Sequence, residues 1–140
     1  IVDLSSNLAS PNSVDAVVTF RNLHNWIGPQ MDTIFKNSYK ALKPGGIFGV
    51  VEHRANPGTS LDVMKKSGYV TESYAIAIAE KHGFVLVDKS EINANPKDLK
   101  NYERGVWTLP PSLRLKDQDR QKYLEIGESD RMTLLFKKPN

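Results

Sequence analysis

Two apolar runs separated by a helical pattern constrain the fold of this chain more than any other feature. The runs span residues 15–20 and 47–51, and neither alternates apolar with polar side chains. Continuous apolarity of this kind is typical of strands buried on both faces of a parallel sheet. Between them, apolar residues recur at helical spacing over residues 31–42, after Pro29 and before a Pro-Gly-Gly turn at residues 44–46. The order predicts a βαβ unit with a right-handed crossover.

The rest of the chain predicts two more helices and two more strands, with no repeat or linker to divide them. We expect a helix over 74–82, a strand over 84–92, a long polar connection over 93–112, a short helix over 117–126 and a last strand over 131–136. His82 falls in the last turn of its helix, just before Gly83, where a cation interacts well with the helix dipole. We interpret His82 as structural.

Composition excludes several classes of function. The chain has 140 residues, 39% hydrophobic and 25% charged, with no cysteine, so it has neither disulfides nor thiolate chemistry. The net charge of +3 is dispersed and predicts no nucleic-acid surface. No apolar run approaches the roughly 20 residues of a membrane span, and we expect a cytoplasmic protein without membrane contact. Three scattered histidines predict no metal site.

The element order and its turns resemble the later half of a class I S-adenosylmethionine-dependent methyltransferase domain. The resemblance rests on residues 15–18, on the turn Leu42-Lys43-Pro44-Gly45-Gly46, on Gly83-Phe84 and on residues 132–137. It implies a Rossmann-like α/β sheet of which this chain supplies the fourth to seventh strands, with the last strand antiparallel between the fifth and sixth. It also implies S-adenosylmethionine as the cofactor and a small molecule as the methyl acceptor.

Two narrower resemblances lie within that family. Phe20-Arg21-Asn22 followed by His24-Asn25 is similar to the Arg-Asn pair of the quinone-biosynthesis C-methyltransferases. Three longer segments more closely resemble an uncharacterised bacterial group of predicted methyltransferases; they span residues 90–96, 105–111 and 126–132. Neither resemblance decides whether oxygen, nitrogen or carbon is methylated.

The glycine-rich turn with which the family binds its cofactor has no counterpart in this sequence. Because the sequence also begins at Ile1, we expect residues 1–140 to be the C-terminal part of a methyltransferase domain. Asp3 and Leu4 match the position of the family's third-strand loop, whose acid contacts the adenine amino group. Asp3 equally suits the cap of an ordinary turn.

Further cofactor contacts are expected at the carboxyl end of the first strand, because open α/β sheets bind ligands there. The family resemblance assigns Phe20, Arg21 and Asn22 to this role. The alternative is a surface loop with Arg21 in a salt bridge.

The catalytic candidates are His24, Glu52 and His53. Imidazole titrates near neutral pH, so His24 suits a general base or a group that orients the acceptor; alternatively it caps the following turn. Glu52 and His53 end the second strand and either orient one another or the acceptor, or form a satisfied polar cluster.

Four further residues are candidates for contact with the acceptor. Trp107 lies in a connection long enough to suggest a function. Asn25 and Arg54 follow strand ends, and Arg131 either reaches an anionic group or pairs with Glu128 or Asp130.

Two classes of function remain open from the sequence. One is a methyltransferase of which this chain is a fragment, inactive by itself. The other is a non-catalytic half-domain, which either pairs with a partner chain or a second copy, or is a degenerate binding module. A sheet without its first strands exposes an unpaired edge, which favours such pairing.

Overall fold

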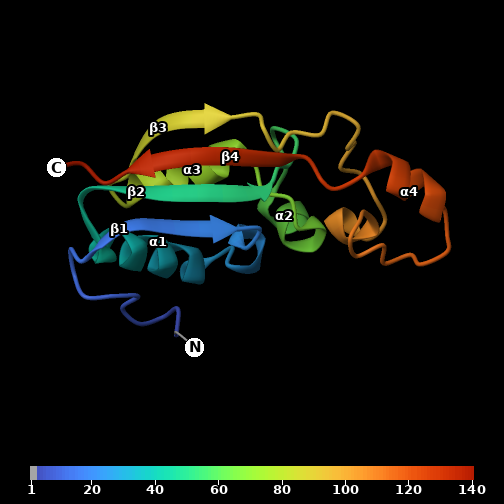
Figure 1. The fold of residues 1–140 in the computed structure, drawn as a ribbon. Helices are drawn as coiled ribbons and strands as arrows, with labels where there is room; N and C mark the ends of the chain where they lie inside the picture. Colours follow the sequence, from blue (N-terminus) through green and yellow to red (C-terminus); the bar gives the residue numbers. More distant parts are fainter. Residues whose placement is uncertain (1–2) are drawn as a thin grey trace.

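The two apolar runs form neighbouring parallel strands in a computed structural model that describes residues 3–140 (Figure 1). β1 (Val14–Phe20) pairs in parallel with β2 (Leu42–His53). β4 (Arg131–Lys137) lies antiparallel between β2 and β3 (Val85–Ser90), which gives the order β1-β2-β4-β3. The predicted α/β fold, with its last strand antiparallel in the sheet, is confirmed.

The structure contains the three predicted helices and three further short helices. α1 (Pro29–Ala41) follows β1 and α3 (Glu72–Lys81) precedes β3. The sequence patterns did not indicate α2 (Leu61–Ser67), nor the short 3-10 helices η1 (Leu23–Asn25) and η2 (Gly105–Thr108). α4 (Arg120–Ile126) is the predicted short helix. Within residues 3–140, no helix combines the length and apolar character needed to cross a membrane.

The Pro-Gly-Gly turn lies inside β2 as an irregularity of the pairing. Val14 pairs with Leu42 and Ala16 with Ile47, so β2 carries extra residues between these two pairs. Gly45 has φ +83, and its amide donates to the Lys138 carbonyl at 2.7 Å. A left-handed glycine therefore turns the chain sharply from α1 into the sheet.

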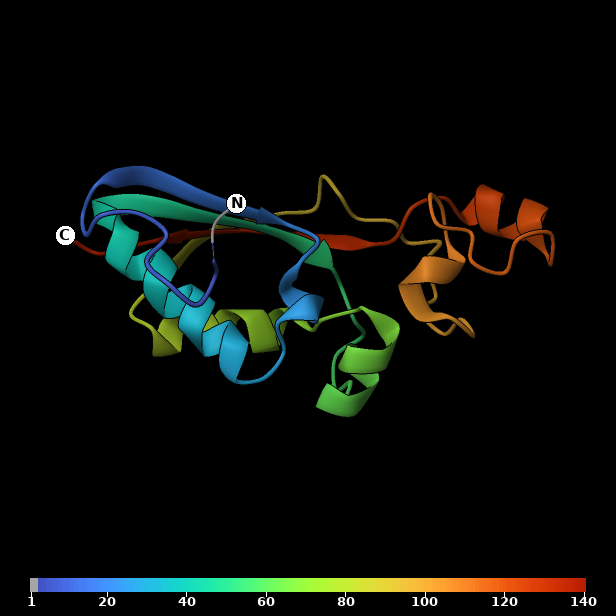
Figure 2. The ribbon, with the colours of Figure 1, turned by 90° about the horizontal axis from the view of Figure 1, so that it is seen from below.

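One face of the sheet is covered and the other is open. α1 and α3 both pack on the same face (Figure 2). The core fills the space between these helices and the strands, and it includes Phe35, Phe48, Phe84, Leu134 and Phe136. No described helix lies over the opposite face. There Val18 and Phe20 are 58% and 57% exposed.

The prediction that the first strand is buried on both faces is therefore wrong for residues 3–140. Its apolar residues fit a covered strand, but the described chain supplies cover for one face only. The open face forms a shallow apolar hollow that crosses the sheet, lined by Val18, Phe20, Gly49, Val51, Thr133 and Leu135 among others.

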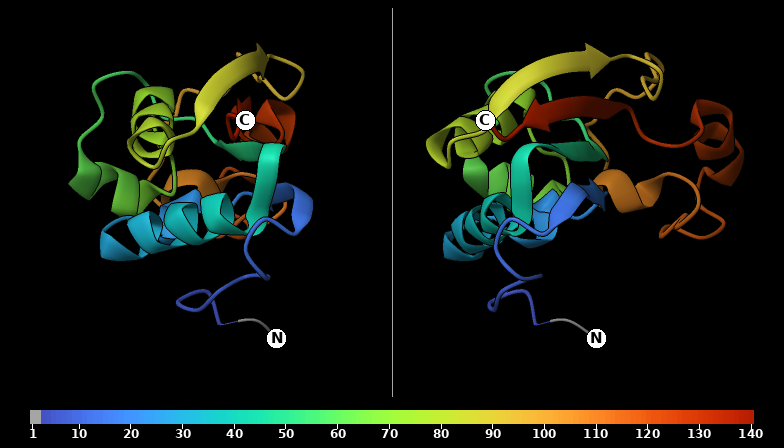
Figure 3. Two further views of the ribbon diagram at one scale, coloured as in Figure 1. Left: turned by 90° about the vertical axis from the view of Figure 1, so that its left-hand side faces the viewer. Right: turned by 60° about the vertical axis from the view of Figure 1, so that its left-hand side comes forward.

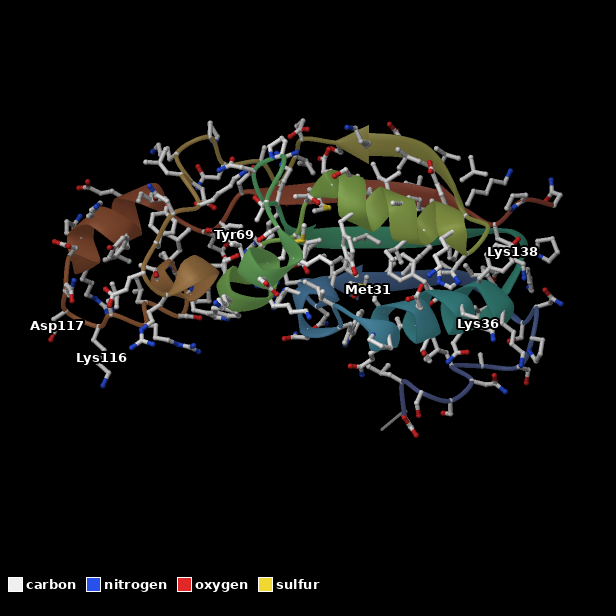
Figure 4. The ribbon with its side chains drawn as sticks, turned by 180° about the vertical axis from the view of Figure 1, so that it is seen from behind. Met31, Lys36, Tyr69, Lys116, Asp117 and Lys138 are labelled. Carbon is white, nitrogen blue, oxygen red and sulfur yellow. The ribbon has the colours of Figure 1, made fainter. Side chains whose placement is uncertain are left out.

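η2 and α4 lie together beyond the carboxyl ends of β1 and β2 (Figures 1 and 3). Figure 4 shows Tyr69 at this end of the molecule and Lys138 at the opposite end. The Tyr69 hydroxyl donates to the buried Asp98 carboxylate, with oxygen separations of 2.9 and 3.0 Å. Burial, followed by the Asp98 charge, raises the pKa of Tyr69 above its usual range. This bond ties the connection after β3 to the segment after α2.

Lys138 closes the other end of the sheet as a buried cation. Its Nζ donates to Asn12 Oδ1 at 2.9 Å and to the carbonyls of Tyr39 and Leu42 at 2.8 Å each. It also lies 4.7 Å from the centre of the Tyr39 ring. The two carbonyls belong to the end of α1, where backbone acceptors lack helical partners and a cation is favourable.

We expect Lys138→Met to lower the free energy of unfolding by about 2–3 kcal/mol, because buried acceptors lose a charged donor. Lys137→Met is the matched control, since the neighbouring side chain points to the opposite face of β4. Urea unfolding of both variants measures the difference. Equal stability of the two variants would contradict the assigned role of Lys138.

Candidate functional site

The predicted catalytic residues converge because they follow the carboxyl ends of two neighbouring parallel strands. Phe20 pairs with Val51, so the segment after β1 lies beside the end of β2. Arg21 adopts φ +57, and its amide donates to the Val51 carbonyl at 2.7 Å. The chain then turns into η1, which places His24 over the end of β2.

The Glu52 carboxylate holds His24 in place. Glu52 is fully buried and lies 3.0 and 3.1 Å from His24 Nδ1 through its two oxygens. It also accepts the backbone amides of His24 at 2.7 Å and His53 at 2.8 Å. A carboxylate at Nδ1 favours the tautomer with the proton on that nitrogen, which leaves the Nε2 lone pair of His24 free.

His53 has a different partner. Its Nδ1 lies 2.5 Å from the buried Ser129 Oγ, which in turn accepts a hydrogen bond from Arg131 Nε at 3.2 Å. Burial, followed by the nearby charges of His24, Arg131 and Arg21, lowers the pKa of His53 to about 3. His53 is therefore neutral at physiological pH.

Ser129 is a site residue that the sequence analysis missed. It lies in the charged turn before β4, within the segment 126–132, whose family resemblance assigns no role to the serine. Only the pairing of β2 with β4, which sets His53 opposite Arg131, brings Ser129 to the imidazole.

The His24 and His53 side chains line one cavity of about 320 Å³, which we call the imidazole pocket. Its wall includes seven of the predicted site residues: Phe20, Arg21, Asn22, His24, His53, Trp107 and Arg131. Glu52 lies behind His24 and does not line the pocket. The ring of Trp107 meets that of His24 edge-on, with centroids 5.8 Å apart.

Trp107 owes its position to the unpredicted helix α2. η2 packs on α2 so closely that a Cβ on Gly105 would lie 2.4 Å from the Ser67 carbonyl oxygen. Gly105 also has φ +57, which glycine adopts without strain. Arg114 lies over the Trp107 ring, 5.4 Å from its centre.

A second cavity of about 490 Å³ lies alongside β1, and we call it the β1 crevice. Leu4, Phe20 and Asn22 line it, so three of the predicted cofactor residues share this place. The Thr19 hydroxyl also lines it and is a buried oxygen without a hydrogen-bond partner among the described residues. Phe20 and Asn22 contribute to both cavities.

Asp3 and Asn25 make local contacts. The Asp3 carboxylate accepts the amide and the hydroxyl of Ser5 at 2.9 and 2.7 Å, which is the turn-capping arrangement weighed from the sequence. Asn25 Nδ2 donates to Asn22 Oδ1 at 3.3 Å. Neither residue lines the imidazole pocket or the β1 crevice.

Arg54 lies outside the imidazole pocket in a network of carboxylates. Its guanidinium donates to Asp130, Glu91 and Glu72 at distances between 2.7 and 3.0 Å. Burial opposes ionisation of Asp130, but hydrogen bonds from Arg54, Lys100 and the Asn95 amide lower its pKa to about 2. Arg54 thus binds the segment after β3 to the start of β4, beside the pocket residue Arg131.

The histidine cluster also has the composition of a metal site. His24, Glu52 and His53 each offer a ligand atom, and these atoms lie within 4.8 Å of one another. The carboxylate already accepts two amides and the His24 ring, so hydrogen bonding accounts for the arrangement. That the protein needs no metal stays a prediction.

His82 is remote from both cavities. Its Nε2 lies 2.8 Å from Asp32 Oδ1, which links the end of α3 to the first turn of α1. This contact agrees with the structural interpretation of His82.

No protein-family model matches the sequence, and no curated protein matches it. Solved structures match its fold. The chain superposes on the [4+2]-cyclase SpnF with a TM-score of 0.65 and 17% identity over 99% of this chain and 55% of that one. It matches an S-adenosylmethionine-dependent methyltransferase from Methanosarcina mazei at a TM-score of 0.61 and 16% identity, over 99% and 65%.

A third match is phosphoethanolamine N-methyltransferase 2 of Haemonchus contortus, solved in complex with S-adenosyl-L-methionine. Its TM-score is 0.61, with 19% identity over 99% of this chain and 36% of that one. The chain thus spans 36–65% of the length of these three structures. At such identities the likeness shows the fold, which is the Rossmann-like α/β fold of class I methyltransferases.

The low pKa of His53 makes stability depend on pH. The imidazole lies near His24, Arg21, Arg131, Ser129, Glu52 and the Tyr69 ring. Unfolded His53 binds a proton below about pH 6.5, whereas the folded residue binds it only near pH 3. Stability should therefore fall as the pH drops through this interval, at up to about 1.4 kcal/mol per pH unit from this group.

His53→Asn should flatten that acid limb between pH 6.5 and about 4, because asparagine does not titrate. Urea unfolding at several pH values measures both slopes. The Asp130 contribution is confined to lower pH, because its pKa falls from 3.8 to about 2. Parallel slopes for the two proteins would show that His53 is not held neutral.

Proposed function

We propose that this chain belongs to an S-adenosylmethionine-dependent methyltransferase that acts on a small molecule, with His24 as general base. The observation that carries the proposal is the buried Glu52–His24 pair at the carboxyl ends of β1 and β2, facing a pocket. Open α/β sheets place their ligands at this edge.

The arrangement suits an acceptor that must lose a proton. Bound S-adenosylmethionine would supply a methyl group on a positively charged sulfur, and that sulfur would keep the electron pair of the broken C–S bond. The acceptor atom forms the new bond to carbon with its own electron pair and gives its proton to His24 Nε2. Glu52 then stabilises the imidazolium through both oxygens, and Trp107 fixes the imidazole edge and shields it from water.

The β1 crevice fits part of the cofactor. Leu4 and Phe20 would supply apolar contacts, while the Thr19 hydroxyl and the Asn22 amide would supply hydrogen bonds. Its lining residues include no carboxylate to bind ribose hydroxyls, a role that an acidic residue commonly fills in such folds. Asp3, held in its turn, would approach the cofactor only from the rim.

The β1 crevice lacks that carboxylate on its lining, and one face of the sheet is open. Both observations support the proposal that this chain is the C-terminal part of a domain. The four strands would then be the fourth to seventh of the family's sheet, as the resemblance implies. The rest of the domain would cover Val18, Phe20 and the edge of β1. The alternative, a non-catalytic half-domain that pairs with a partner, is favoured by the same exposed apolar face.

His24→Gln should lower kcat by about 10²- to 10⁴-fold, because proton transfer to a positioned base contributes this much. The dissociation constant for S-adenosylmethionine should stay unchanged, since His24 does not line the β1 crevice. Glu52→Gln should act in the same direction. Single-turnover kinetics with an acceptor found by screening, together with calorimetry, separate the two quantities.

His82→Gln is the matched control, because this histidine joins α3 to α1 far from the pocket. Its kcat should equal that of the unsubstituted protein. A His24→Gln protein that keeps full turnover, or loses cofactor affinity and turnover equally, would rule out the base assignment.

The 140-residue chain by itself should bind S-adenosylmethionine more weakly than micromolar and should self-associate, because its apolar sheet face and β1 edge are open. The protein made from the whole coding sequence should bind in the micromolar range. Calorimetry and sedimentation velocity on both forms test this. A monomeric 140-residue chain with micromolar affinity would contradict the assignment as part of a domain.

A further inference from the structure

The imidazole pocket carries two guanidinium groups and no carboxylate on its wall. Arg131 enters from the start of β4 and Arg21 from the end of β1. Both lie near enough to His53 to lower its pKa, which agrees with their place beside the same ring. Glu52 forms no ion pair with either arginine among the described residues, and its oxygens accept three N–H groups beneath His24.

The hydrogen bonds of Arg131 leave part of its guanidinium for a ligand. Nε donates to Ser129 Oγ, and Nη2 donates to Glu128 at 3.1 Å, a residue whose side chain is 55% exposed. Nη1 lies in neither bond. An exposed ion pair of this kind contributes little and yields readily to a better anion.

Arg21 occupies a backbone conformation that arginine rarely adopts. Its φ of +57 is strained for a residue with a side chain, and glycine would avoid that strain. Strained positions of this kind cluster at ligand sites. Here the turn directs the chain from β1 into η1 and sets the guanidinium at the pocket.

The two imidazoles offer opposite hydrogen-bonding groups. His24 Nδ1 is bonded to Glu52, so its Nε2 is an acceptor. Among residues 3–140, His53 Nδ1 is the one acceptor in hydrogen-bond contact with Ser129 Oγ, so we assign the hydroxyl proton to that bond, which places the His53 proton on Nε2. The pocket thus presents one acceptor, one neutral donor and two cations beside the ring of Trp107.

Resting on the function proposed above, we infer that the methyl acceptor is an aromatic acid whose hydroxyl group stands next to its carboxylate. The hydroxyl hydrogen-bonds to His24 Nε2, and the carboxylate accepts from His53 Nε2–H and from Arg131 and Arg21. The ring lies against Trp107. A cavity of about 320 Å³ has room for one such ring.

The methylation step balances with the groups on the wall. The hydroxyl oxygen forms the new O–C bond, its proton passes to His24 Nε2, and the C–S bond breaks with its electrons on sulfur. The carboxylate stays ionised and unmethylated, so the product is a methyl ether.

The test is a binding measurement without cofactor on the protein made from its whole coding sequence. Salicylate is the probe, and salicylamide, which keeps the hydroxyl but lacks the charge, is its matched partner. Calorimetry should show salicylate binding at least about tenfold tighter, since a charge-assisted pair is worth more than a kilocalorie. Arg131→Gln and Arg21→Gln should each remove most of that preference.

Arg120→Gln, on the exposed first turn of α4, is the control and should keep the preference. Arg21→Gln leaves the hydrogen bonds of Ser129 intact. If Arg131→Gln misfolds, the affinities of Arg21→Gln for salicylate and salicylamide therefore test the inference. Equal affinity for salicylate and salicylamide, or a preference that survives both pocket substitutions, would overturn the inference and leave the proposed function standing.

Product analysis separates the two proposals further. With S-adenosylmethionine and salicylate, mass spectrometry should find the methyl ether. A methyl ester would overturn the assignment of the hydroxyl as nucleophile. Salicylate binding that depends on Arg21 and Arg131, without methyl transfer to any acceptor, would overturn the proposed function and leave an anion site.

Discussion

The buried Glu52 carboxylate is the contact on which the arrangement of the site depends. It accepts the amides of His24 and His53 and the His24 ring, so one side chain joins the end of β2 to the turn after β1. A carboxylate without exposure to water must have each oxygen satisfied, and these three donors meet that need. The same bonds that stabilise the buried charge also set the orientation of the proposed base, so stability and chemistry share one interaction.

The turn before β4 organises the opposite wall. Ser129 bonds the His53 ring, while its neighbour Asp130 receives Arg54 and the amide of Asn95. Two consecutive residues thus support the pocket from inside and fasten the long connection after β3 from outside. The ion pairs around Asp130 form a partly buried network, in which removing one partner would leave the others uncompensated.

Both open features of the molecule lie along β1. Its outer face exposes Val18 and Phe20, and the crevice beside it contains a buried hydroxyl, that of Thr19, with no partner in residues 3–140. Apolar exposure of this extent on a strand at the edge of a sheet invites association. A cofactor in the crevice and further polypeptide on the open face would remove both features together. The proposal that the crevice binds cofactor and the proposal that the chain is part of a larger domain are therefore linked.

Periodicity and turn residues were sufficient to predict α1, α3 and the four strands, because these depend on local patterns. The antiparallel direction of the last strand was implied by the family resemblance alone. The sequence also placed His24, Glu52 and His53 at strand ends. It did not indicate α2, η2 or Ser129, since short helices and isolated serines carry no periodic signal. Nor did it separate Arg54, which is held by carboxylates, from Arg131, which lines the pocket. Those assignments depend on contacts between segments distant in the chain, such as His53 and Ser129, which are 76 positions apart, and only the folded sheet brings these segments together.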